Sequence, residues 1–568
     1  MSVVDASGSV PSHVQASFCA TLVDQFALDG VTHAFIAPGS RSTPMAVAIA
    51  RHPAFRVTVT IDERTAAFAG LGSGLATGRP ALVLCTSGTA ATHFHAAVVE
   101  ADLSAVPLIV LTADRPPELR DVAAPQTINQ TRIFGDAVRW FHDPGVPVIE
   151  AAMSWRSLAR RTVWLSTGRA PGPVHLNLPF REPLLADVPV EPVPASGSSS
   201  LQLAAQLVDP SAVDELAAQV SGRRGVLVVG RGSPERGTVD ALAARLGWPV
   251  MAEPRAGCTG AASSVRHFDA VLRVVGDDES LRPEVVIRVG EAPASKVLAQ
   301  WITRSGARQI HVTASPRVAD SDHSMDARVE GDTGGILRRL AEVSTTCDPA
   351  WAGRWRAMSA AASGAIRAVL DATDEVAPLS VVFRLPGSLP VGGNLVVSSS
   401  MPVRNLEWFG GDCDHLRVFA NRGANGIDGV VATALGVASS GGGPTTVLIG
   451  DVALVHDLSS VAALATSGLP VTLVVCDNDG GGIFEFLPQA ELLDRASFEQ
   501  LFGTPHGLDL AAVLRGMGLP VHQPESMVGL VDSMSTPGPA VVMVRSRRED
   551  DVDEHRRLQR VVAEALRV

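Results

Sequence analysis

Residues 444–482 read PTTVLIGDVALVHDLSSVAALATSGLPVTLVVCDNDGGG, and this stretch decides the fold class. Two apolar runs rich in β-branched residues, TTVLIG and VTLVV, flank an alanine-rich segment, and short polar turns separate the three. Strands that alternate with helical segments predict βαβ units, in which neighbouring strands run parallel. The stretch therefore predicts an α/β domain built on a parallel sheet.

Residues 80–114 repeat this plan as PALVLCTSGTAATHFHAAVVEADLSAVPLIVLTAD. Each copy has a strand, a polar turn, a helix and a second strand. The prolines that precede the two strands are 27 residues apart here and 26 apart in the later stretch, so Asp114 falls opposite Asp477. Chance similarity between doubly wound units is one explanation. Duplicated domains that bind different parts of one ligand are the other.

Between the copies, the runs GVLVVG, PEVVIRVG and ARQIHVTA predict strands of a third α/β domain. The segment GRGSPERG is not a complete GxGxxG motif, so we expect no dinucleotide site there. A Pro/Ser-rich stretch over residues 185–203 predicts a linker, and a weaker boundary falls between STTCDPAW and DATDEVAP. We expect three doubly wound parallel-sheet domains, over residues 1–185, 204–345 and 365–568.

Composition narrows the class of protein. A chain of 568 residues exceeds one core, and its formal net charge of −12 argues against a nucleic-acid partner. No apolar run reaches bilayer length and the start shows no secretory signal, so we expect no membrane insertion. Six scattered cysteines without a CxxC pair suit reduced thiols in a cytoplasmic protein. Tyrosine is absent, so acid–base chemistry must use carboxylates, His, Lys, Arg or a cofactor.

Polar residues follow two successive strands of the later copy. Asp451 comes directly after TTVLIG, and Asn478 follows the next strand, 27 residues later. Because the carboxyl ends of neighbouring parallel strands meet at one sheet edge, these side chains should lie together. Their oxygens, a glycine carbonyl such as that of Gly480 and phosphate oxygens would complete a magnesium site. The structural alternative is a strand-to-helix turn that Asp and Asn merely cap.

A GD turn followed about 27 residues later by N-x-G resembles the diphosphate motif of the thiamine-diphosphate enzymes. Six segments in order, APGSRSTP, TSGTA, LTADRPPELR, NRGANGIDG, GDVALVHDL and NDGGGIFEFLP, are similar to one family among them. That family makes 2-succinyl-5-enolpyruvyl-6-hydroxy-3-cyclohexene-1-carboxylate (SEPHCHC) in menaquinone biosynthesis. The resemblance implies the thiamine-diphosphate-enzyme fold, with an aminopyrimidine-binding first domain and a diphosphate- and Mg-binding third domain.

The resemblance also implies thiamine diphosphate and Mg²⁺, or Mn²⁺, as cofactors. Glu63 matches the catalytic glutamate, whose carboxylate bonds the aminopyrimidine and favours its imino tautomer; the adjacent Asp62 is expected to be structural. Ile427 in GANGIDG matches the residue that holds the cofactor bent. The other implied cofactor-binding residues are Gly450, Asp451, Val452, Asn478 and Gly480, of which Asp451, Asn478 and Gly480 bind the metal.

The implied reaction decarboxylates 2-oxoglutarate and adds the succinyl-semialdehyde carbanion to isochorismate, giving SEPHCHC and CO₂. Both substrates carry two carboxylates, for which the planar fork of arginine is suited. The residues that match substrate contacts are Ser40, Arg41, Arg115, Gln126, Lys296, Ser400, Arg404 and Arg422, with an apolar wall of Ile483, Phe484 and Leu487.

Two positions depart from the family pattern. Pro125 stands where relatives carry Asn, which removes an amide donor, and His93 stands where they often carry Asn. Two other functions stay open: an acetolactate-synthase-like 2-oxoacid decarboxylase or carboligase, and a non-catalytic binding relative. The resemblance further implies a homodimer or homotetramer, with Glu63 from one subunit and its partner supplying Asp451, Asn478 and Ile427.

Overall fold

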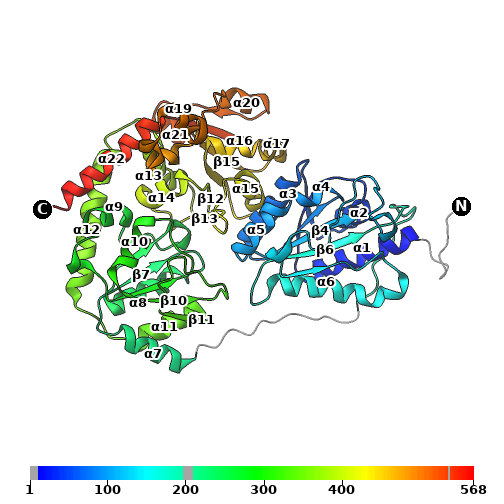
Figure 1. Ribbon diagram of the computed structural model, residues 1–568, viewed down its shortest axis with the longest axis horizontal. Helices are drawn as coiled ribbons and strands as arrows, with labels where there is room; N and C mark the ends of the chain where they lie inside the picture. The colour runs from blue at the N-terminus through cyan, green and yellow to red at the C-terminus, as the bar shows by residue number, and fades with distance from the viewer. Residues whose placement is uncertain (1–10, 196–208, 535–537, 568) are drawn as a thin grey trace. The chain divides into compact units, whose positions relative to one another are not determined.

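The computed structural model of the protein describes residues 11–195, 209–534 and 538–567. The first ten residues and part of the predicted linker lie outside the described residues. The described chain forms two compact bodies. The first comprises residues 11–195 with 421–441 and 456–471, and the second comprises the rest. Three parallel sheets confirm the predicted α/β class (Figure 1).

The first body contains a six-stranded sheet in the order β2-β1-β3-β4-β6-β5, with every strand pair parallel. The central strands β3 and β4 are buried along their whole length, as their apolar runs predict. The strands are β1 (His33–Ile36), β2 (Arg56–Val59), β3 (Ala81–Cys85), β4 (Leu108–Asp114), β5 (Trp140–His142) and β6 (Pro173–Pro179).

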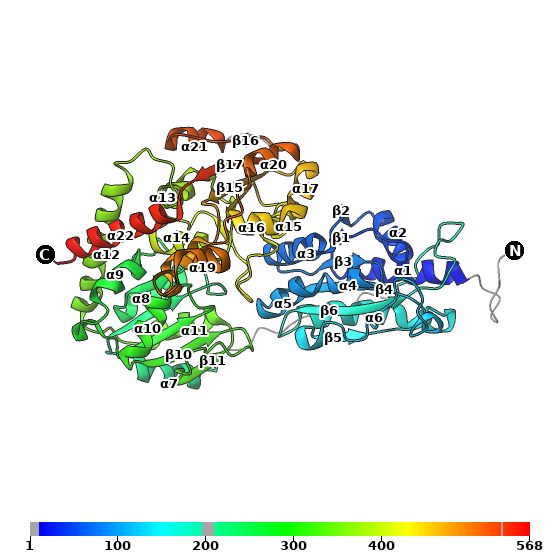
Figure 2. The ribbon, with the colours of Figure 1, turned by 45° about the horizontal axis from the view of Figure 1, so that its top comes forward.

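Two groups of helices pack against this sheet. Helices α1 and α6 pack together, and α2 packs on α1. Helix α3 packs on β1, β3 and α5, and α3 and α6 are labelled on different sides of the sheet in Figure 2. These helices are α1 (Pro11–Leu28), α2 (Thr43–Arg51), α3 (Glu63–Thr77), α4 (Thr89–Thr92), α5 (His95–Leu103) and α6 (Ala152–Thr167).

The first body also takes in α15 (Val430–Ser439) and α17 (Leu458–Ser467) from far along the chain. Glycines allow α3 and α15 to approach closely. A Cβ at Gly72 would lie 2.0 Å from the Thr433 carbonyl oxygen, and one at Gly436 would lie 1.9 Å from that of Ala69. Any larger side chain at either glycine would therefore push the two helices apart.

The second body contains the two remaining sheets over one continuous apolar core. Its five-stranded sheet has the order β11-β10-β9-β7-β8 and confirms the strands predicted for the middle of the chain. The strands are β7 (Gly225–Val229), β8 (Val250–Ala252), β9 (Val285–Val289), β10 (Arg308–Thr313) and β11 (Ala327–Glu330). The helices are α7 (Pro210–Val220), α8 (Arg236–Leu246), α9 (Phe268–Val275), α10 (Lys296–Ser305) and α11 (Thr333–Val343).

The third sheet has six strands in the order β13-β12-β14-β15-β17-β16. The strands are β12 (Asn394–Val397), β13 (Arg417–Phe419), β14 (Thr445–Gly450), β15 (Val471–Asp477), β16 (Val521–His522) and β17 (Ala540–Arg545). The helices of this part are α12 (Pro349–Leu370), α13 (Pro378–Ser388), α14 (Met401–Phe409), α16 (Asp451–His456), α18 (Gln489–Leu492), α19 (Arg495–Phe498), α20 (Leu510–Gly516), α21 (Met527–Ser533) and α22 (Arg548–Ala565). Helix α12 occupies most of the stretch where the sequence suggested a weaker boundary.

The first and third sheets have the same topology. Counted in chain order, the strands of each follow the order 2-1-3-4-6-5. The predicted correspondence also holds in detail, because β4 ends at Asp114 and β15 ends at Asp477, each after seven residues. The sequence echo therefore reflects two domains of one architecture.

Two further expectations concern the whole chain. No helix among the described residues is long and apolar enough to cross a membrane. All six cysteines lie in the described part and none forms a disulfide.

Candidate active site

Asp451 and Asn478 meet at the carboxyl ends of the adjoining strands β14 and β15, as predicted. Asp451 is 3% exposed and accepts three backbone N–H bonds. Val452 donates to Oδ1 at 2.7 Å, and Gly480 and Asn478 donate to Oδ2 at 2.8 and 3.2 Å. Burial raises the pKa of Asp451, and the N–H groups of Gly480 and Val452 oppose that rise. The loop thus closes around one carboxylate.

The Asn478 side chain is held on one side only. Its Nδ2 donates to Asp551 Oδ2 at 2.9 Å, while its Oδ1 is buried and accepts no hydrogen bond from the described residues. A buried amide oxygen without a donor needs an explanation, and a cation beside the Asp451 carboxylate supplies one. The Gly480 carbonyl accepts from Gly482 N–H at 2.9 Å, which leaves it one lone pair.

The backbone beside these oxygens suits a closely held ligand. A Cβ at Gly450 would have no other atom within 4 Å, so open space adjoins the end of β14. Gly480 adopts φ +137°, and a Cβ there would lie 2.0 Å from the Gly503 carbonyl oxygen. Only glycine therefore fits at position 480. The residues present fit a hard divalent cation with a diphosphate beside it.

His506, which no sequence pattern selects, lies at the same corner. Its Nε2 is 3.4 Å from Asp451 Oδ2 and 3.9 Å from Asp477 Oδ1. Its Nδ1 accepts from Leu508 N–H at 3.0 Å, so Nε2 carries the proton in the neutral ring. A cavity of about 420 Å³ opens beside His506, lined also by Asp477, Asp479, Gly507, Leu508, Asp509, Arg545 and Ser546.

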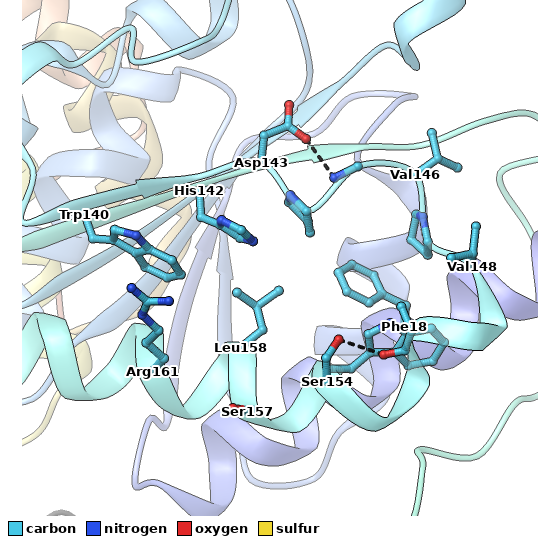
Figure 3. A pocket seen from close by; sticks show the side chains of 15 residues that line it. Phe18, Trp140, His142, Asp143, Val146, Val148, Ser154, Ser157, Leu158 and Arg161 are labelled. Atoms are coloured by element: carbon cyan, nitrogen blue, oxygen red, sulfur yellow. Dashed lines mark hydrogen bonds between the residues drawn. The ribbon is translucent and has the colours of Figure 1, made fainter.

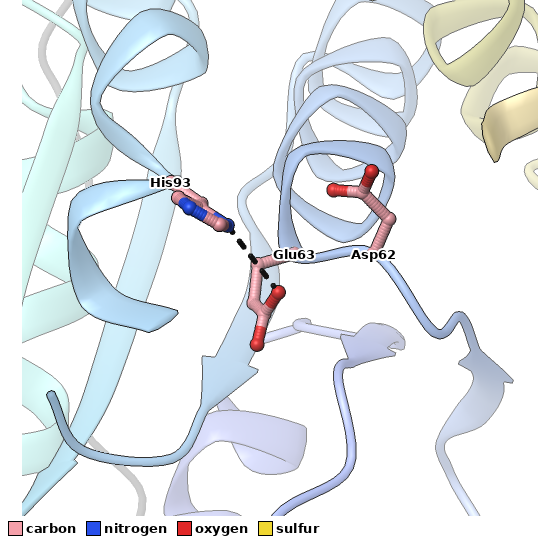
Figure 4. Close-up of side chains that lie close together, drawn as sticks. All are labelled: Asp62, Glu63 and His93. Atoms are coloured by element: carbon pink, nitrogen blue, oxygen red, sulfur yellow. Dashed lines mark ion pairs between the residues drawn. The ribbon is translucent and has the colours of Figure 1, made fainter. Parts of the chain in front are cut away.

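Glu63 begins α3 in the first body, directly after Asp62 (Figure 4). Asp62 caps the helix by accepting from Arg64 N–H at 2.9 Å and pairs with the Arg64 guanidinium at 2.7 Å, which confirms its structural role. Burial works against ionisation of Asp62, but the Arg64 bonds prevail and lower its pKa to about 2. The Glu63 carboxylate, by contrast, has His93 Nδ1 at 3.5 Å.

The loops after β1, β3 and β4 bring together another predicted group. Arg41 is buried and donates to the Phe180 carbonyl and to Glu182, each at 3.0 Å. Arg115 donates to Ser87 Oγ at 2.7 Å and to the Pro125 carbonyl at 3.1 Å. Burial, followed by repulsion from Arg41, lowers the pKa of Arg115. Two crowded cations favour an anionic ligand between them.

Gln126 and Ser40 lie in the same loops. Gln126 adopts the left-handed conformation at φ +56° and donates from Nε2 to the Ser87 carbonyl at 3.1 Å. Ser40 is exposed and its carbonyl accepts from Thr43 N–H. Although Pro125 departs from the family pattern, the Pro125 carbonyl still accepts a hydrogen bond from Arg115.

In the second body, Ser400 precedes α14 with φ +71°, and its carbonyl accepts from Arg404 at 2.7 Å. Burial lowers the pKa of Arg404, against the attraction of Glu407. Ala294 N–H donates to the Glu407 carboxylate at 2.8 Å, which ties α14 to the loop before Lys296. Lys296 itself is exposed at the start of α10.

The apolar residues expected to form a wall follow Gly482 in a 3₁₀ turn (Gly482–Phe486). The Phe484 and Phe502 rings pack with centroids 5.4 Å apart. Ile483 is half-buried, and Leu487 is 39% exposed. Leu487 is therefore the one of the three with the most surface open to a ligand.

Arg422 and Ile427 lie in the loop 421–429 of the first body, and both are half-buried. Glu100, also missed by sequence reasoning, anchors this loop. Its carboxylate accepts from Gly423 and Ala424 N–H, each at 2.7 Å. Ile427 thus lies in the same body as Glu63 of its own chain, whereas Asp451 and Asn478 lie in the other body.

A separate hollow of about 330 Å³ adjoins the edge strand β5 and α6 (Figure 3). The Trp140 and His142 rings stack at 4.9 Å, and the Arg161 guanidinium lies 4.3 Å from the Trp140 ring centre. None of the predicted site residues lines this hollow.

Family models match all three parts of the chain. They are the N-terminal TPP-binding domain of thiamine pyrophosphate enzymes over residues 18–133, the middle domain over 201–397 and the C-terminal TPP-binding domain over 414–544. A solved structure described as a candidate thiamin diphosphate-dependent enzyme from Mycobacterium smegmatis shares the fold. It is 18% identical, has a TM-score of 0.69, and the match covers 94% of this chain and 99% of that one. The class is that of the thiamine pyrophosphate enzymes.

Curated relatives narrow the class further. Proteins named 2-succinyl-5-enolpyruvyl-6-hydroxy-3-cyclohexene-1-carboxylate synthase match over nearly their full length. The Thermobifida fusca protein is 41% identical over 96% of this chain and 98% of its own. Those of Geobacillus kaustophilus and Myxococcus xanthus are 40% and 38% identical, over 97% and 98% of this chain and 98% and 99% of their own. The chain belongs to this family of SEPHCHC synthases.

Proposed function

We propose that the protein decarboxylates 2-oxoglutarate with thiamine diphosphate and joins the remaining four-carbon unit to isochorismate, giving SEPHCHC and CO₂. The observation that carries the proposal, in a chain of this family, is the buried Asn478 Oδ1, which accepts no hydrogen bond from the described residues. The backbone N–H of the same residue bonds the buried Asp451 carboxylate. Thiamine diphosphate, when bound, supplies the electron sink for loss of CO₂. The protein supplies binding, orientation and charge.

Asp451, Asn478 and the Gly480 carbonyl would hold Mg²⁺ or Mn²⁺, and the space beside Gly450 would receive the diphosphate. The backbone donors on Asp451 orient its carboxylate without neutralising it. Its negative charge therefore stays available to the cation. The Val452 N–H, which fixes Asp451 Oδ1, completes the predicted cofactor-binding turn.

Glu63 would hold a proton at the aminopyrimidine ring. A carboxylate that is hydrogen-bonded to a ring nitrogen can keep that nitrogen protonated. The Glu63 side chain, at the start of α3, is only 20% exposed to solvent. His93 at 3.5 Å can share a hydrogen bond with that carboxylate. We assign His93 no catalytic role.

The arginines would bind substrate carboxylates. Arg41 and Arg115 crowd one another in the first body, and Arg404 is half-buried in the second, so each group gains when an anion pairs with it. Ser40, Gln126, Lys296, Ser400 and Arg422 would add polar contacts. Ile483, Phe484 and Leu487 would exclude water from the reacting atoms.

The test is CO₂ release from 2-oxoglutarate by the purified protein, with and without thiamine diphosphate, Mg²⁺ and isochorismate. We expect release to require both cofactors and SEPHCHC to form only with isochorismate. Pyruvate in place of 2-oxoglutarate is the matched control. Faster turnover of pyruvate would support an acetolactate-synthase-like carboligase, and no cofactor-dependent release would support a non-catalytic relative.

We propose further that residues 1–185 bind the aminopyrimidine, residues 365–568 bind the diphosphate and metal, and residues 204–345 separate them. Two chains would then pair as a homodimer, or as a homotetramer of two pairs, with Glu63 from one subunit and Asp451 and Asn478 from its partner. Mixing inactive Glu63→Gln and Asp451→Ala chains should restore activity, since hybrid dimers hold one intact site. No recovery despite proven subunit exchange would place each site within one chain.

The six free cysteines support a cytoplasmic location.

A further inference from the structure

The orientation of the Asn478 amide depends on a residue that no part of the proposed function uses. Asp551 lies in the first turn of α22, and its Oδ2 accepts from Asn478 Nδ2 at 2.9 Å. The same oxygen accepts from Ser546 Oγ at 3.1 Å. Asn478 is in turn fixed at its backbone, whose N–H donates to Asp451 at 3.2 Å. Asn478 is therefore held at its backbone N–H and at its side-chain Nδ2.

A carboxylate can only accept hydrogen bonds from an amide, so Asp551 distinguishes the two ends of the Asn478 side chain. The NH₂ end must face Asp551, because the oxygen end would meet a like partial charge. The amide group is planar, so fixing Nδ2 fixes the direction of Oδ1. In the structure this places Oδ1 in its buried position without any donor.

We propose that Asp551 is a positioning residue for the cation site, because it holds the Asn478 amide in the orientation that offers Oδ1 to the metal. This inference rests on the proposed function, since it needs a cation at Asp451 and Asn478. Partners that orient metal ligands typically change metal affinity by 10–100-fold when they are removed. Asp551 does not touch the metal in this scheme and is not a catalytic residue.

The test measures Mn²⁺ binding directly. Free Mn²⁺ is followed by electron paramagnetic resonance while the ion is titrated into full-length protein with saturating thiamine diphosphate. Asp551→Asn keeps the shape but can face Asn478 with either end of its amide, so we expect about tenfold weaker Mn²⁺ binding. Asp550→Asn is the matched control, because Asp550 is exposed and loses the same charge one residue away. We expect that control to stay within twofold.

Repeating the Mn²⁺ titration in an Asn478→Asp protein distinguishes loss of amide orientation from simple loss of charge. In Asn478→Asp the two oxygens of residue 478 are equivalent, so nothing remains for Asp551 to orient. There Asp551 has no amide to orient, so adding Asp551→Asn removes only a nearby charge and should weaken Mn²⁺ binding much less than the same change does beside Asn478. A purely electrostatic contribution of Asp551 would weaken binding equally in both backgrounds. The difference between the two losses is therefore specific to orientation.

Unaltered Mn²⁺ affinity in a folded Asp551→Asn protein, or an equal loss in Asp550→Asn, would overturn the inference. So would an equal loss of Mn²⁺ affinity in both backgrounds. Asp451→Ala in the same titration tests the cation site itself. If Asp451→Ala loses Mn²⁺ and Asp551→Asn does not, the inference alone fails; if Asp451→Ala binds normally, the proposed site fails. Thermal unfolding of each variant shows which proteins are folded.

Discussion

The carboxyl edges of the first and third sheets share one topology but treat their acids differently. Asp114, at the end of β4, is 1% exposed and meets the Arg120 guanidinium at 3.0 Å and the Asn177 amide at 2.9 Å. Asp451, after β14, receives its hydrogen bonds from backbone N–H groups of the described residues. One carboxylate is neutralised by a side-chain cation, and the other keeps its charge.

This difference shows that two sheets of the same topology can use a buried acid in different ways, one to stabilise the fold and the other to bind a ligand. An acid paired with arginine stabilises the fold but has little left to offer a ligand. Burial raises the pKa of both acids, but the Asn177 amide and the Arg120 guanidinium oppose that rise at Asp114. Asp451 is held by backbone N–H groups and gains when a cation binds. Four predictions test this contrast.

The largest effect is expected at Glu63, the acid that we propose binds the aminopyrimidine. Glu63→Gln should slow proton exchange at C2 of bound thiamine diphosphate by at least a hundredfold, since a positioned acid or base typically contributes 10²–10⁴-fold. Hydrogen–deuterium exchange followed by NMR measures that rate. Asp62→Ala is the control and should lower the melting temperature through the lost cap while exchange continues. Wild-type exchange in Glu63→Gln would remove Glu63 from the reaction.

The next effect compares these two acids directly. Asp451→Ala should weaken thiamine-diphosphate binding at limiting Mg²⁺ by about a hundredfold, because a hard cation loses its anionic ligand. Asp114→Ala should instead cost about 2 kcal/mol of unfolding free energy, because Arg120 and Asn177 lose a buried partner. Calorimetry and urea unfolding measure the two quantities. A loss of cofactor binding in Asp114→Ala with normal binding in Asp451→Ala would reverse the assignment.

A smaller effect is expected at Arg404, the half-buried arginine of α14. Arg404→Ala should raise KM for a dicarboxylate substrate about thirtyfold, equivalent to about 2 kcal/mol, and leave thiamine-diphosphate affinity unchanged. Arg304, on α10 and 59% exposed, provides the control, and Arg304→Ala should change neither quantity. Equal KM values in the two variants would show that Arg404 does not bind substrate.

The smallest effect is a loss of stability at acid pH, to which one buried histidine in each body contributes. Burial lowers the pKa of His175 on β6 and of His555 on α22 to about 3, whereas unfolded histidine titrates near 6.5. Their contribution to stability is therefore complete above pH 6.5 and is lost as pH falls toward 3, at roughly 1.4 kcal/mol per pH unit for each. His555→Phe should reduce this slope in urea unfolding between pH 7.5 and 5, and exposed His456→Gln should not. An unchanged slope in His555→Phe would contradict the assignment.

The strands and the meeting of Asp451 with Asn478 were predictable because both follow from local pattern. Continuous apolar runs specify buried parallel strands, and the edge rule then brings Asp451 and Asn478 together. The roles of the arginines and of Glu63 came from family resemblance, and they stay predictions.

Other features depend on contacts that no local pattern encodes. Asp551 is one of several acids in REDDVDE, and only the fold shows which one faces Asn478. His506 reaches Asp451 from a loop 55 residues further along the chain. The sharing of α15 and α17 with the first body depends on glycine contacts between residues more than 350 positions apart.

That shared helix pair has a consequence for the order in which the protein is made. Ten consecutive residues of α3, Thr65–Gly74, are buried in the finished first body, and α15 is part of what covers them. When the ribosome has released residue 203, about 220 residues remain before the segment 421–441 begins to emerge. At 5–20 residues per second this is a delay of roughly 10–45 s. During that delay the face of α3 that α15 covers in the finished protein lacks this partner.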